Sequence, residues 1–200
     1  RSTLAFQAGA SSPFAISSLR IQGGGLAAPI FLLSTIPSTS WPLAVAASSV
    51  SYARVSDSAA APPVIHANDG TSTGMANSAN WNFSPFLSIG LAGQTYVEGV
   101  GLTGSVAVST AGFSTATVRA VSASSTTVTT ASFPVALSSD DANEPAILQQ
   151  PLVNGATQFA LLVPTARTTT LQASSAQAYA AAYGAQLLVG PSYFTRLQLL

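Results

Sequence analysis

The sequence has no cysteine and no lysine, and it carries few charges of either sign. Only 6% of its 200 residues are charged, whereas an ordinary soluble domain carries about 25%. The six basic residues are all arginine, and six acids balance them, so the formal net charge at pH 7 is zero. Without cysteine the chain can form neither a disulfide nor a cysteine-based zinc site.

Two explanations account for the missing charge. In the first, much of the surface is covered by other protein, as in a shell or a fibre. In the second, a biased coding composition enriches alanine, glycine, serine, threonine and proline and depletes lysine. A subunit with near-zero net charge associates readily. Hydrophobic residues make up 48% of the chain, so a packed core is expected rather than disorder.

Long apolar runs are missing as well. The apolar stretch at residues 25–33 is interrupted by Pro29 and is shorter than the about 18 residues that cross a bilayer, so we expect no membrane span. The chain begins at Arg1 and shows no signal-peptide layout. We therefore expect either a removed precursor segment or a numbering that begins inside a longer chain.

Short strand signals separated by turn residues fill most of the sequence. They are clearest between Thr95 and Phe133, where valine and threonine predominate and glycines divide the run. Branched side chains of this kind favour the pleated surface of a strand. Asn154-Gly155 is the strongest hairpin signal in the chain. Strands do not alternate with helices here, so a βαβ fold is not expected.

These signals predict an all-β fold: a single-domain antiparallel β-sandwich, possibly a jelly roll, over residues 1–200. The polar stretch at about residues 56–82 is predicted to be a long loop excursion, and such loops are usually functional or packed by a partner. The sequence shows no internal repeat and no linker that would divide it. Residues 171–183 have a helix-like composition but lead into another strand, so their structure is left open.

Catalytic chemistry has little support in the sequence. His66 is the only histidine, so a Ser-His-Asp triad would have to use it, with Asp69 close by in sequence. A glycosidase or an aspartic protease would instead need two cooperating carboxylates. No Asp-Thr-Gly motif is present. The acids available for such a pair are Asp57, Asp69, Glu98, Asp140, Asp141 and Glu144.

The densest set of oxygen ligands lies just before Pro145. Asp140, Asp141 and Glu144 are close together there, and calcium prefers several carboxylates on a flexible loop. A calcium ion between subunits is the only cofactor that the sequence suggests. The alternative, a solvated turn before the proline, is favoured, because the spacing does not match an EF-hand.

Other binding features are weak. Six scattered arginines form no basic stripe, so little direct nucleic-acid binding is expected. The letters Asn82-Phe83-Ser84 spell a glycosylation sequon, but its neighbours look buried. Aromatic residues often anchor interfaces, and those considered for a partner surface, although they are more often core, are Trp41, Trp81, Phe83 and Phe86.

The sequence therefore predicts a structural, self-assembling subunit and not an enzyme. The leading hypothesis is a viral capsid protein in the virion, packed against copies of itself and possibly against other shell subunits. The first alternative is an extracellular or cell-surface adhesin-like or pilus-like β module. The second alternative is a hydrolase that uses His66 or a carboxylate pair. The resemblance to small capsid proteins is one of architecture alone.

Overall fold

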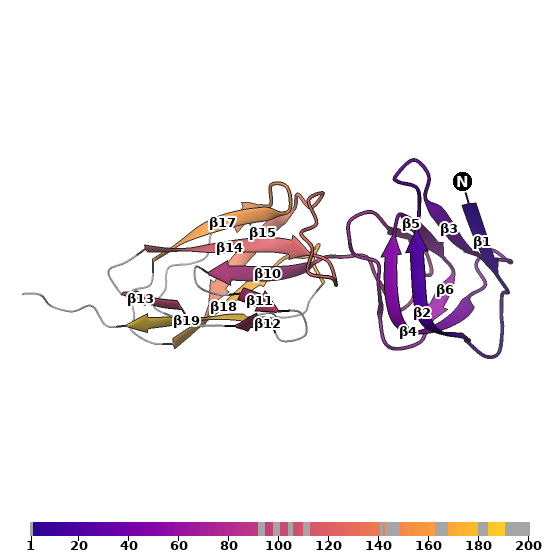
Figure 1. The fold of residues 1–200 in the computed structure, drawn as a ribbon, viewed down its shortest axis with the longest axis horizontal. Helices are drawn as coiled ribbons and strands as arrows, with labels where there is room; N and C mark the ends of the chain where they lie inside the picture. The colour runs from indigo at the N-terminus through magenta and orange to yellow at the C-terminus, as the bar shows by residue number, and fades with distance from the viewer. Residues whose placement is uncertain are drawn as a thin grey trace, which may run out of the picture. The chain divides into compact units, whose positions relative to one another are not determined.

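The computed structural model describes residues 2–91, 95–97, 101–103, 106–109, 113–140, 142, 149–162, 168–179 and 184–190. These residues form strands, turns and bends, and none of them is helical, so the prediction of a β-rich chain is confirmed. The chain divides into two compact units (Figure 1). Unit 1 comprises Arg1–Pro85 and Val121–Val128, and unit 2 comprises Phe86–Ala120 and Thr129–Leu200. The sequence predicted one domain over 1–200 without such a division.

Unit 1 consists of short strands that pair in parallel (Figure 1). One sheet has the order β1-β3-β5-β8, a second has the order β2-β4-β6, and β7 pairs with β9. The strands are β1 Ser2–Phe6, β2 Phe14–Gln22, β3 Ile30–Ser34, β4 Trp41–Ser51, β5 Ala53–Ser56, β6 Ser58–Ala60, β7 Ile65–His66, β8 Thr73–Ala76 and β9 Trp81–Asn82.

The strand order makes unit 1 a stack of coils. The chain passes from the first sheet to the second and back, and each pass adds one strand to each sheet, which is the arrangement of a β-solenoid. Residues in register on successive coils form columns. Leu4 pairs with Leu32, which pairs with Val55, while Phe14 pairs with Leu43. Each coil therefore covers the apolar residues of the one before it.

The prediction of antiparallel pairing is wrong for unit 1. All its strand pairs between named strands are parallel. The stretch at 56–82, predicted to be a loop, contains β6, β7, β8 and β9 and so forms the last coils of the stack. Its strands are only two to four residues long, and several of their residues are alanine, glycine or asparagine, which are depleted in strands. Their pairing with the coils before them, rather than their own propensity, makes them strands.

One corner of the stack is built from left-handed residues. Ser38, Asp57 and Asn77 have φ values of 63°, 56° and 47°, and each follows a strand of the first sheet. Aspartate and asparagine adopt this conformation more readily than most residues. Successive coils are hydrogen-bonded at this corner, since the Trp41 amide donates to the Asp57 carbonyl (2.8 Å) and the Asp57 amide donates to the Ala76 carbonyl (2.8 Å).

The interior of unit 1 is apolar and centres on Trp41. This side chain has no exposed surface, and its Nε1–H donates to the Ser56 carbonyl (2.9 Å). Phe6 stacks on the indole, with ring centroids 3.9 Å apart and an interplanar angle of 9°. Leu32, Leu43, Val55 and Ile65 belong to the same buried cluster.

The described residues of unit 2 form three sheets, with the orders β10-β14-β17, β11-β12 and β13-β19-β18-β15-β16 (Figure 1). β13 and β19 pair in parallel, whereas β11–β12, β14–β17, β15–β16, β15–β18 and β18–β19 are antiparallel. The strands are β10 Phe86–Leu91, β11 Thr95–Val97, β12 Gly101–Thr103, β13 Val106–Ser109, β14 Phe113–Val121, β15 Pro134–Ser139, β16 Gln149–Pro151, β17 Ala156–Leu162, β18 Thr168–Ser174 and β19 Gly184–Gly190.

Two local predictions fall in unit 2. Asn154 and Gly155 have φ values of 52° and 78° and join β16 to β17, with Val153 bridged to Ala156. Two positive φ values in a two-residue turn are the type I′ geometry that an Asn-Gly pair favours. The predicted tight turn is therefore present, although β16 and β17 belong to different sheets and are joined there only by this bridge. Of the ambiguous stretch 171–183, the first part belongs to β18 and continues into a turn, and 180–183 lie outside the described residues.

Gly23 allows a close approach between two coils. A Cβ added there would lie 2.5 Å from the Tyr52 carbonyl oxygen, which is backbone and has little room to move. We expect Gly23→Ala to lower the free energy of unfolding of unit 1 by about 1–3 kcal/mol, as overpacking does. Both tryptophans, Trp41 and Trp81, lie in unit 1, so urea unfolding followed by tryptophan fluorescence reports on this unit.

Gly24→Ala is the matched control for that measurement. The nearest atom to its added Cβ is the Ala28 Cβ at 3.4 Å, an ordinary contact. We expect this variant to stay within about 0.5 kcal/mol of the parent, as surface substitutions usually do. Equal losses in the two variants would contradict the close approach of Gly23 to Tyr52.

Candidate functional site

His66 lies in the last part of the coil stack, opposite Asn82 in the β7–β9 pair. Its Nδ1 is 3.2 Å from Asn82 Nδ2, and an unprotonated Nδ1 accepts a hydrogen bond from that amide. Partial burial lowers the pKa of His66, because it disfavours the charged imidazolium. Asn82 is itself buried, and its Oδ1 accepts from the Ser84 amide at 2.9 Å. Asn82, the asparagine of the glycosylation sequon, is therefore a buried side chain that is hydrogen-bonded within unit 1.

Asp69, the acid nearest His66 in sequence, is part of a turn. Its Oδ1 accepts hydrogen bonds from the Thr71 amide (3.0 Å) and the Thr71 hydroxyl (2.7 Å). The Thr71 Oγ1 in turn accepts from the Tyr52 amide at 2.8 Å, which joins this turn to the preceding coil. The contacts of Asp69 thus connect two coils, which is a structural role, and the hydrolase alternative gains no further support from them.

The other predicted acids are dispersed. Asp140 Oδ1 accepts from the Thr170 amide at 2.9 Å, which joins the end of β15 to β18. The predicted calcium ligands Asp141 and Glu144, and the strand acid Glu98, lie outside the described residues. Among the residues that the structure does describe, no three histidine, cysteine or acidic side chains gather closely enough to hold a metal ion.

Asp57 is the best-connected acid of unit 1. Its carboxylate accepts hydrogen bonds from Asn77 Nδ2 (2.8 Å) and from Ser56 Oγ (3.0 Å). The Asn77 amide lowers the pKa of Asp57 most, and Ser56 and the Ser38 backbone lower it further, against a burial effect that raises it. Because Ser38 and Asn77 lie at the same corner on the coils before and after it, the ionised carboxylate joins three successive coils.

The aromatic residues predicted as partner anchors lie at different places. Trp41 has no exposed surface, and Trp81 is 8% exposed with its Nε1–H donating to Ser58 Oγ at 2.9 Å. Phe83 stacks on Trp81, with centroids 6.0 Å apart. In unit 2, Phe86 makes an edge contact with Tyr179. Trp41 and Trp81 are therefore core residues of unit 1.

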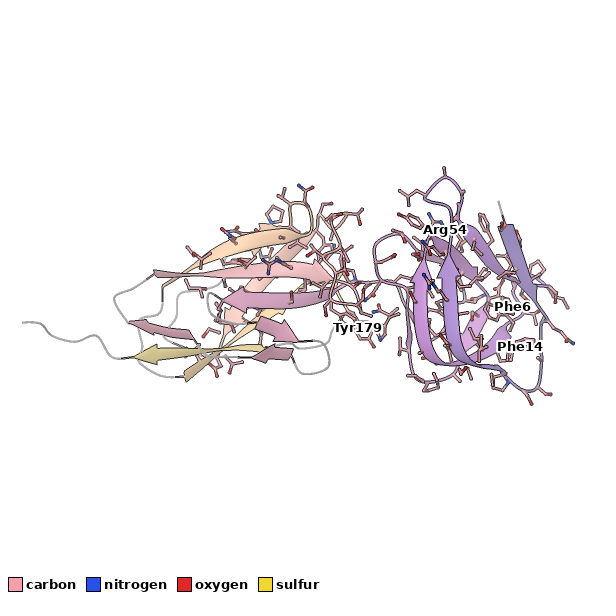
Figure 2. All side chains as sticks on the ribbon, viewed as in Figure 1. Phe6, Phe14, Arg54 and Tyr179 are labelled. Carbon is pink, nitrogen blue, oxygen red and sulfur yellow. The ribbon has the colours of Figure 1, made fainter. Side chains whose placement is uncertain are left out.

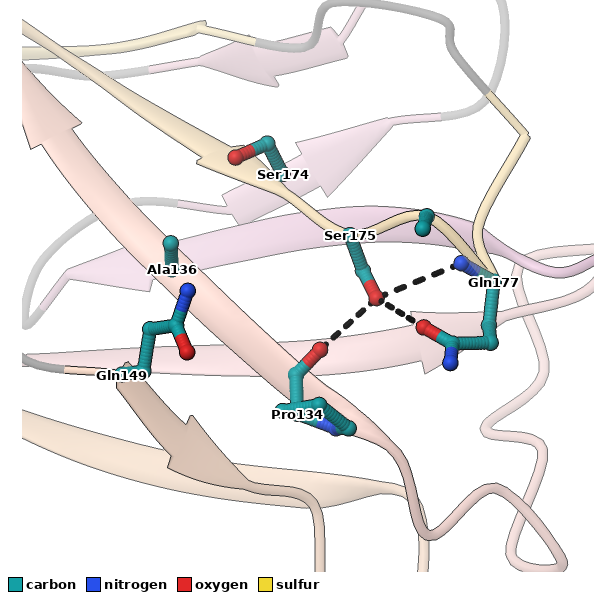
Figure 3. A pocket seen from close by; sticks show the side chains of 7 residues that line it. Pro134, Ala136, Gln149, Ser174, Ser175 and Gln177 are labelled. Carbon is teal, nitrogen blue, oxygen red and sulfur yellow. Dashed lines mark hydrogen bonds between the residues drawn. The ribbon is translucent and has the colours of Figure 1, made fainter.

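A depression of about 450 Å³ lies in unit 2 beside β15 and β18 (Figure 3). Its lining carries no charged side chain. Ser175 Oγ lies 2.7 Å from the Pro134 carbonyl oxygen and 2.9 Å from Gln177 Oε1, and its single hydrogen serves one acceptor at a time. The lining offers neutral hydrogen-bonding groups and no acid or base, and the hydroxyl already bonds within the protein. The lining residues are Pro134, Ala136, Gln149, Ser174, Ser175, Ala176 and Gln177.

The first coil of unit 1 leaves core positions uncovered. Leu4, Phe14 and Ile16 are 47%, 37% and 38% exposed. Their partners in register on the next coil, Leu32, Leu43 and Val45, are 1%, 1% and 5% exposed. These residues of the first coil thus continue the apolar columns, and within the part of the chain that the structure describes they stay partly exposed. We call Leu4, Phe14 and Ile16 the open end of unit 1; Figure 2 shows Phe14 there beside Phe6, with ring centroids 5.9 Å apart.

The opposite end of the stack is covered. A Cβ added at Gly74, in the last strand of the first sheet, would lie 2.8 Å from the ring of Phe83, so this ring fills the space over the column. The segment 121–128 also joins this end, because Asn68 Oδ1 accepts from the Ala123 amide at 3.0 Å. The two ends of unit 1 therefore differ in how their apolar interior is closed.

The sequence did not indicate the open end. The sequence predicts a single sandwich, in which a facing sheet would cover the apolar residues of the first strands. In the sequence, the apolar face of two consecutive strands indicates that both border an apolar interior. It does not show where the stack of coils ends. Only the pairing of β1 with β3 and of β2 with β4 shows that these strands form the first coil.

Comparison with protein-family models, with curated proteins and with solved structures finds no match to this chain. Among the described residues, no helix has the length and apolar composition that crossing a bilayer requires. Function is therefore inferred from the chain's own residues.

The lowered pKa of Asp57 has a consequence for stability at acid pH. Folding favours the ionised carboxylate, so its contribution is complete above the unfolded-state pKa of about 3.9. That contribution is lost as the pH falls through the lower pKa of the folded state. We expect the free energy of unfolding of unit 1 to fall more steeply between about pH 5 and pH 2 in the parent than in Asp57→Asn.

Asp57→Asn suits this comparison because asparagine tolerates the left-handed conformation and has no titrating group. Urea unfolding at each pH, followed by tryptophan fluorescence, gives the two curves. Parallel curves for parent and variant over this range would show that the Asn77 contact does not stabilise the ionised carboxylate.

Proposed function

We propose that this chain is a structural, self-associating subunit of a larger protein assembly. The observation that carries the proposal is the open end of unit 1, where Leu4, Phe14 and Ile16 continue buried columns but remain between 37% and 47% exposed. Contiguous exposed apolar surface marks interaction sites in soluble proteins. A chain with zero formal net charge approaches its own copies without electrostatic repulsion.

The assembly is either a viral shell or a fibre outside the cell. The parallel coils of unit 1 favour the fibre over the shell. The shell hypothesis was based on a single antiparallel sandwich, which is not the arrangement of unit 1. Adhesin-like or pilus-like modules at the cell surface are therefore the preferred form of this proposal.

For unit 2 we propose the sandwich arrangement predicted for the whole chain. β10 belongs to the sheet with β14 and β17, and it contacts β18 and β19 of the five-stranded sheet. Contacts between strands of different sheets are expected when two sheets pack face to face. In this proposal unit 2 is a compact β module that accompanies the coil stack.

Analytical ultracentrifugation of the purified chain between about 1 and 100 µM tests self-association, since the oligomer population follows concentration. We expect a concentration-dependent shift from monomer to oligomer. Negative-stain images of the concentrated sample then separate the two forms of assembly, because filaments support the fibre and closed particles support the shell. A monodisperse monomer over the whole range would contradict the proposal.

A further inference from the structure

A row of three residues across the five-stranded sheet of unit 2 shapes the depression there. Ala136 of β15 pairs in register with Gln149 of β16 on one side and with Ser174 of β18 on the other. Residues directly opposite one another on neighbouring antiparallel strands lie on the same face of a sheet. Because the Ala136 methyl group is the smallest of the three side chains, it forms the floor of the depression of about 450 Å³ (Figure 3).

The turn that follows β18 forms a second wall. The Gln177 backbone amide donates to Ser175 Oγ (3.4 Å), and the Ser175 hydroxyl lies 2.9 Å from Gln177 Oε1. When Oε1 accepts the hydroxyl hydrogen, the Gln177 carboxamide nitrogen keeps two hydrogens for another acceptor. The turn therefore presents a donor group at the depression (Figure 3).

The two glutamines of β16 are used differently. Successive side chains of a strand point to opposite faces, and Gln150 Oε1 accepts a hydrogen bond from the Thr157 hydroxyl at 3.2 Å. Gln149 lies at the depression beside Ala136 (Figure 3), and within the described part of the chain no hydrogen bond engages its carboxamide. This group offers one acceptor oxygen and two donor hydrogens to a ligand.

The depression lies over an interior strand. β15 stands between β18 and β16, so strand neighbours engage its backbone on both sides. An extended peptide that adds to a sheet needs an exposed edge instead. A ligand above Ala136 is therefore recognised by side chains. The volume of about 450 Å³ falls in the range of about 300–1,000 Å³ that is typical of small-molecule sites.

The lining selects for a neutral ligand. None of the lining side chains is charged, so an anion or a cation would lose hydration without gaining an ionic partner. Pro134, Ala136 and Ala176 add apolar surface beside the two carboxamides. A sugar ring has hydroxyl groups around its edge, each of which donates and accepts, and C–H groups on its faces. These groups match a lining of amides and small apolar side chains.

We propose that the depression of unit 2 binds a neutral saccharide, with the carboxamides of Gln149 and Gln177 hydrogen-bonded to ring hydroxyls above Ala136. The proposal rests on the adhesin-like form of the function proposed above and names its class of ligand. The two carboxamides belong to exposed residues, so a single site binds weakly. An assembly that presents many copies of the site binds a surface of repeated sugars far more tightly, because later contacts are intramolecular.

Saturation-transfer difference NMR of the full chain tests the ligand class. The neutral probes are methyl glucoside, methyl galactoside, methyl mannoside and N-acetylglucosamine, and the charged counterparts are glucuronate and glucosamine. We expect a response from at least one neutral sugar and a weaker response from the charged ones. No response from any neutral sugar in the high-millimolar range would overturn the proposal. So would binding of a blocked trialanine peptide alone, which would indicate a peptide site.

Two substitutions test the place of binding. Gln149→Ala removes a carboxamide that makes no hydrogen bond within the described chain, and we expect it to raise the dissociation constant about three- to tenfold through the loss of one or two hydrogen bonds. Gln158→Ala is the matched control, since this exposed glutamine of β17 pairs with Thr117 in a different sheet. Ala136→Leu fills the floor, and we expect it to abolish binding. Amide NMR spectra show whether each variant keeps the fold of unit 2.

The outcomes separate this inference from the broader proposal. Unchanged binding in a folded Ala136→Leu chain would overturn the site, and so would equal weakening by Gln149→Ala and Gln158→Ala. Oligomers that bind no neutral sugar would overturn the inference and leave self-association intact. A monomer that binds a sugar in the expected way would support the site and contradict self-association.

Discussion

The dependence of each coil on the next is the constraint that governs unit 1. One coil is too thin to bury its own apolar face, so its interior is completed only when a neighbour covers it. Leu32 and Leu43, with coils on both sides, are each 1% exposed, whereas Leu4 and Phe14, with a coil on one side only, are 47% and 37% exposed. A stack of this kind must close each end with something other than another of its own coils, and here Phe83 and the segment 121–128 close one of them.

Amide, hydroxyl and carboxylate groups at the corners join the coils in a chain with so few charges. Asp57 connects the coils of Ser38 and Asn77, and Asp69 acts through Thr71 on Tyr52 of the preceding coil. Side chains that bond to the backbone satisfy groups that the corners would otherwise leave unpaired. These contacts also explain why residues that suggest chemistry in the sequence, such as a lone histidine with an aspartate three positions later, are occupied with holding turns together.

The sequence predicted the type of element better than the way elements pair. Alternation of apolar and polar residues identifies a strand but is the same for parallel and antiparallel neighbours. A coil stack is recognised in a sequence by a fixed period, and here the spacing shortens along the chain, from Ser2 and Ile30 to Arg54 and Thr73. The tight turn at Asn154-Gly155 was predictable because its geometry depends on two residues, while the open end depends on pairing between residues far apart.

The position of the exposed apolar residues bears on why the chain carries so little charge. A biased coding composition would act on the whole chain and would not select particular positions. Singly exposed apolar residues, such as Leu26 and Val153, are normal on a protein surface. Leu4, Phe14 and Ile16 differ from these because they lie in register with buried residues and beside two free strand edges. In the self-association proposed above, charge at such positions would be unfavourable, because like charges on two copies would oppose the contact.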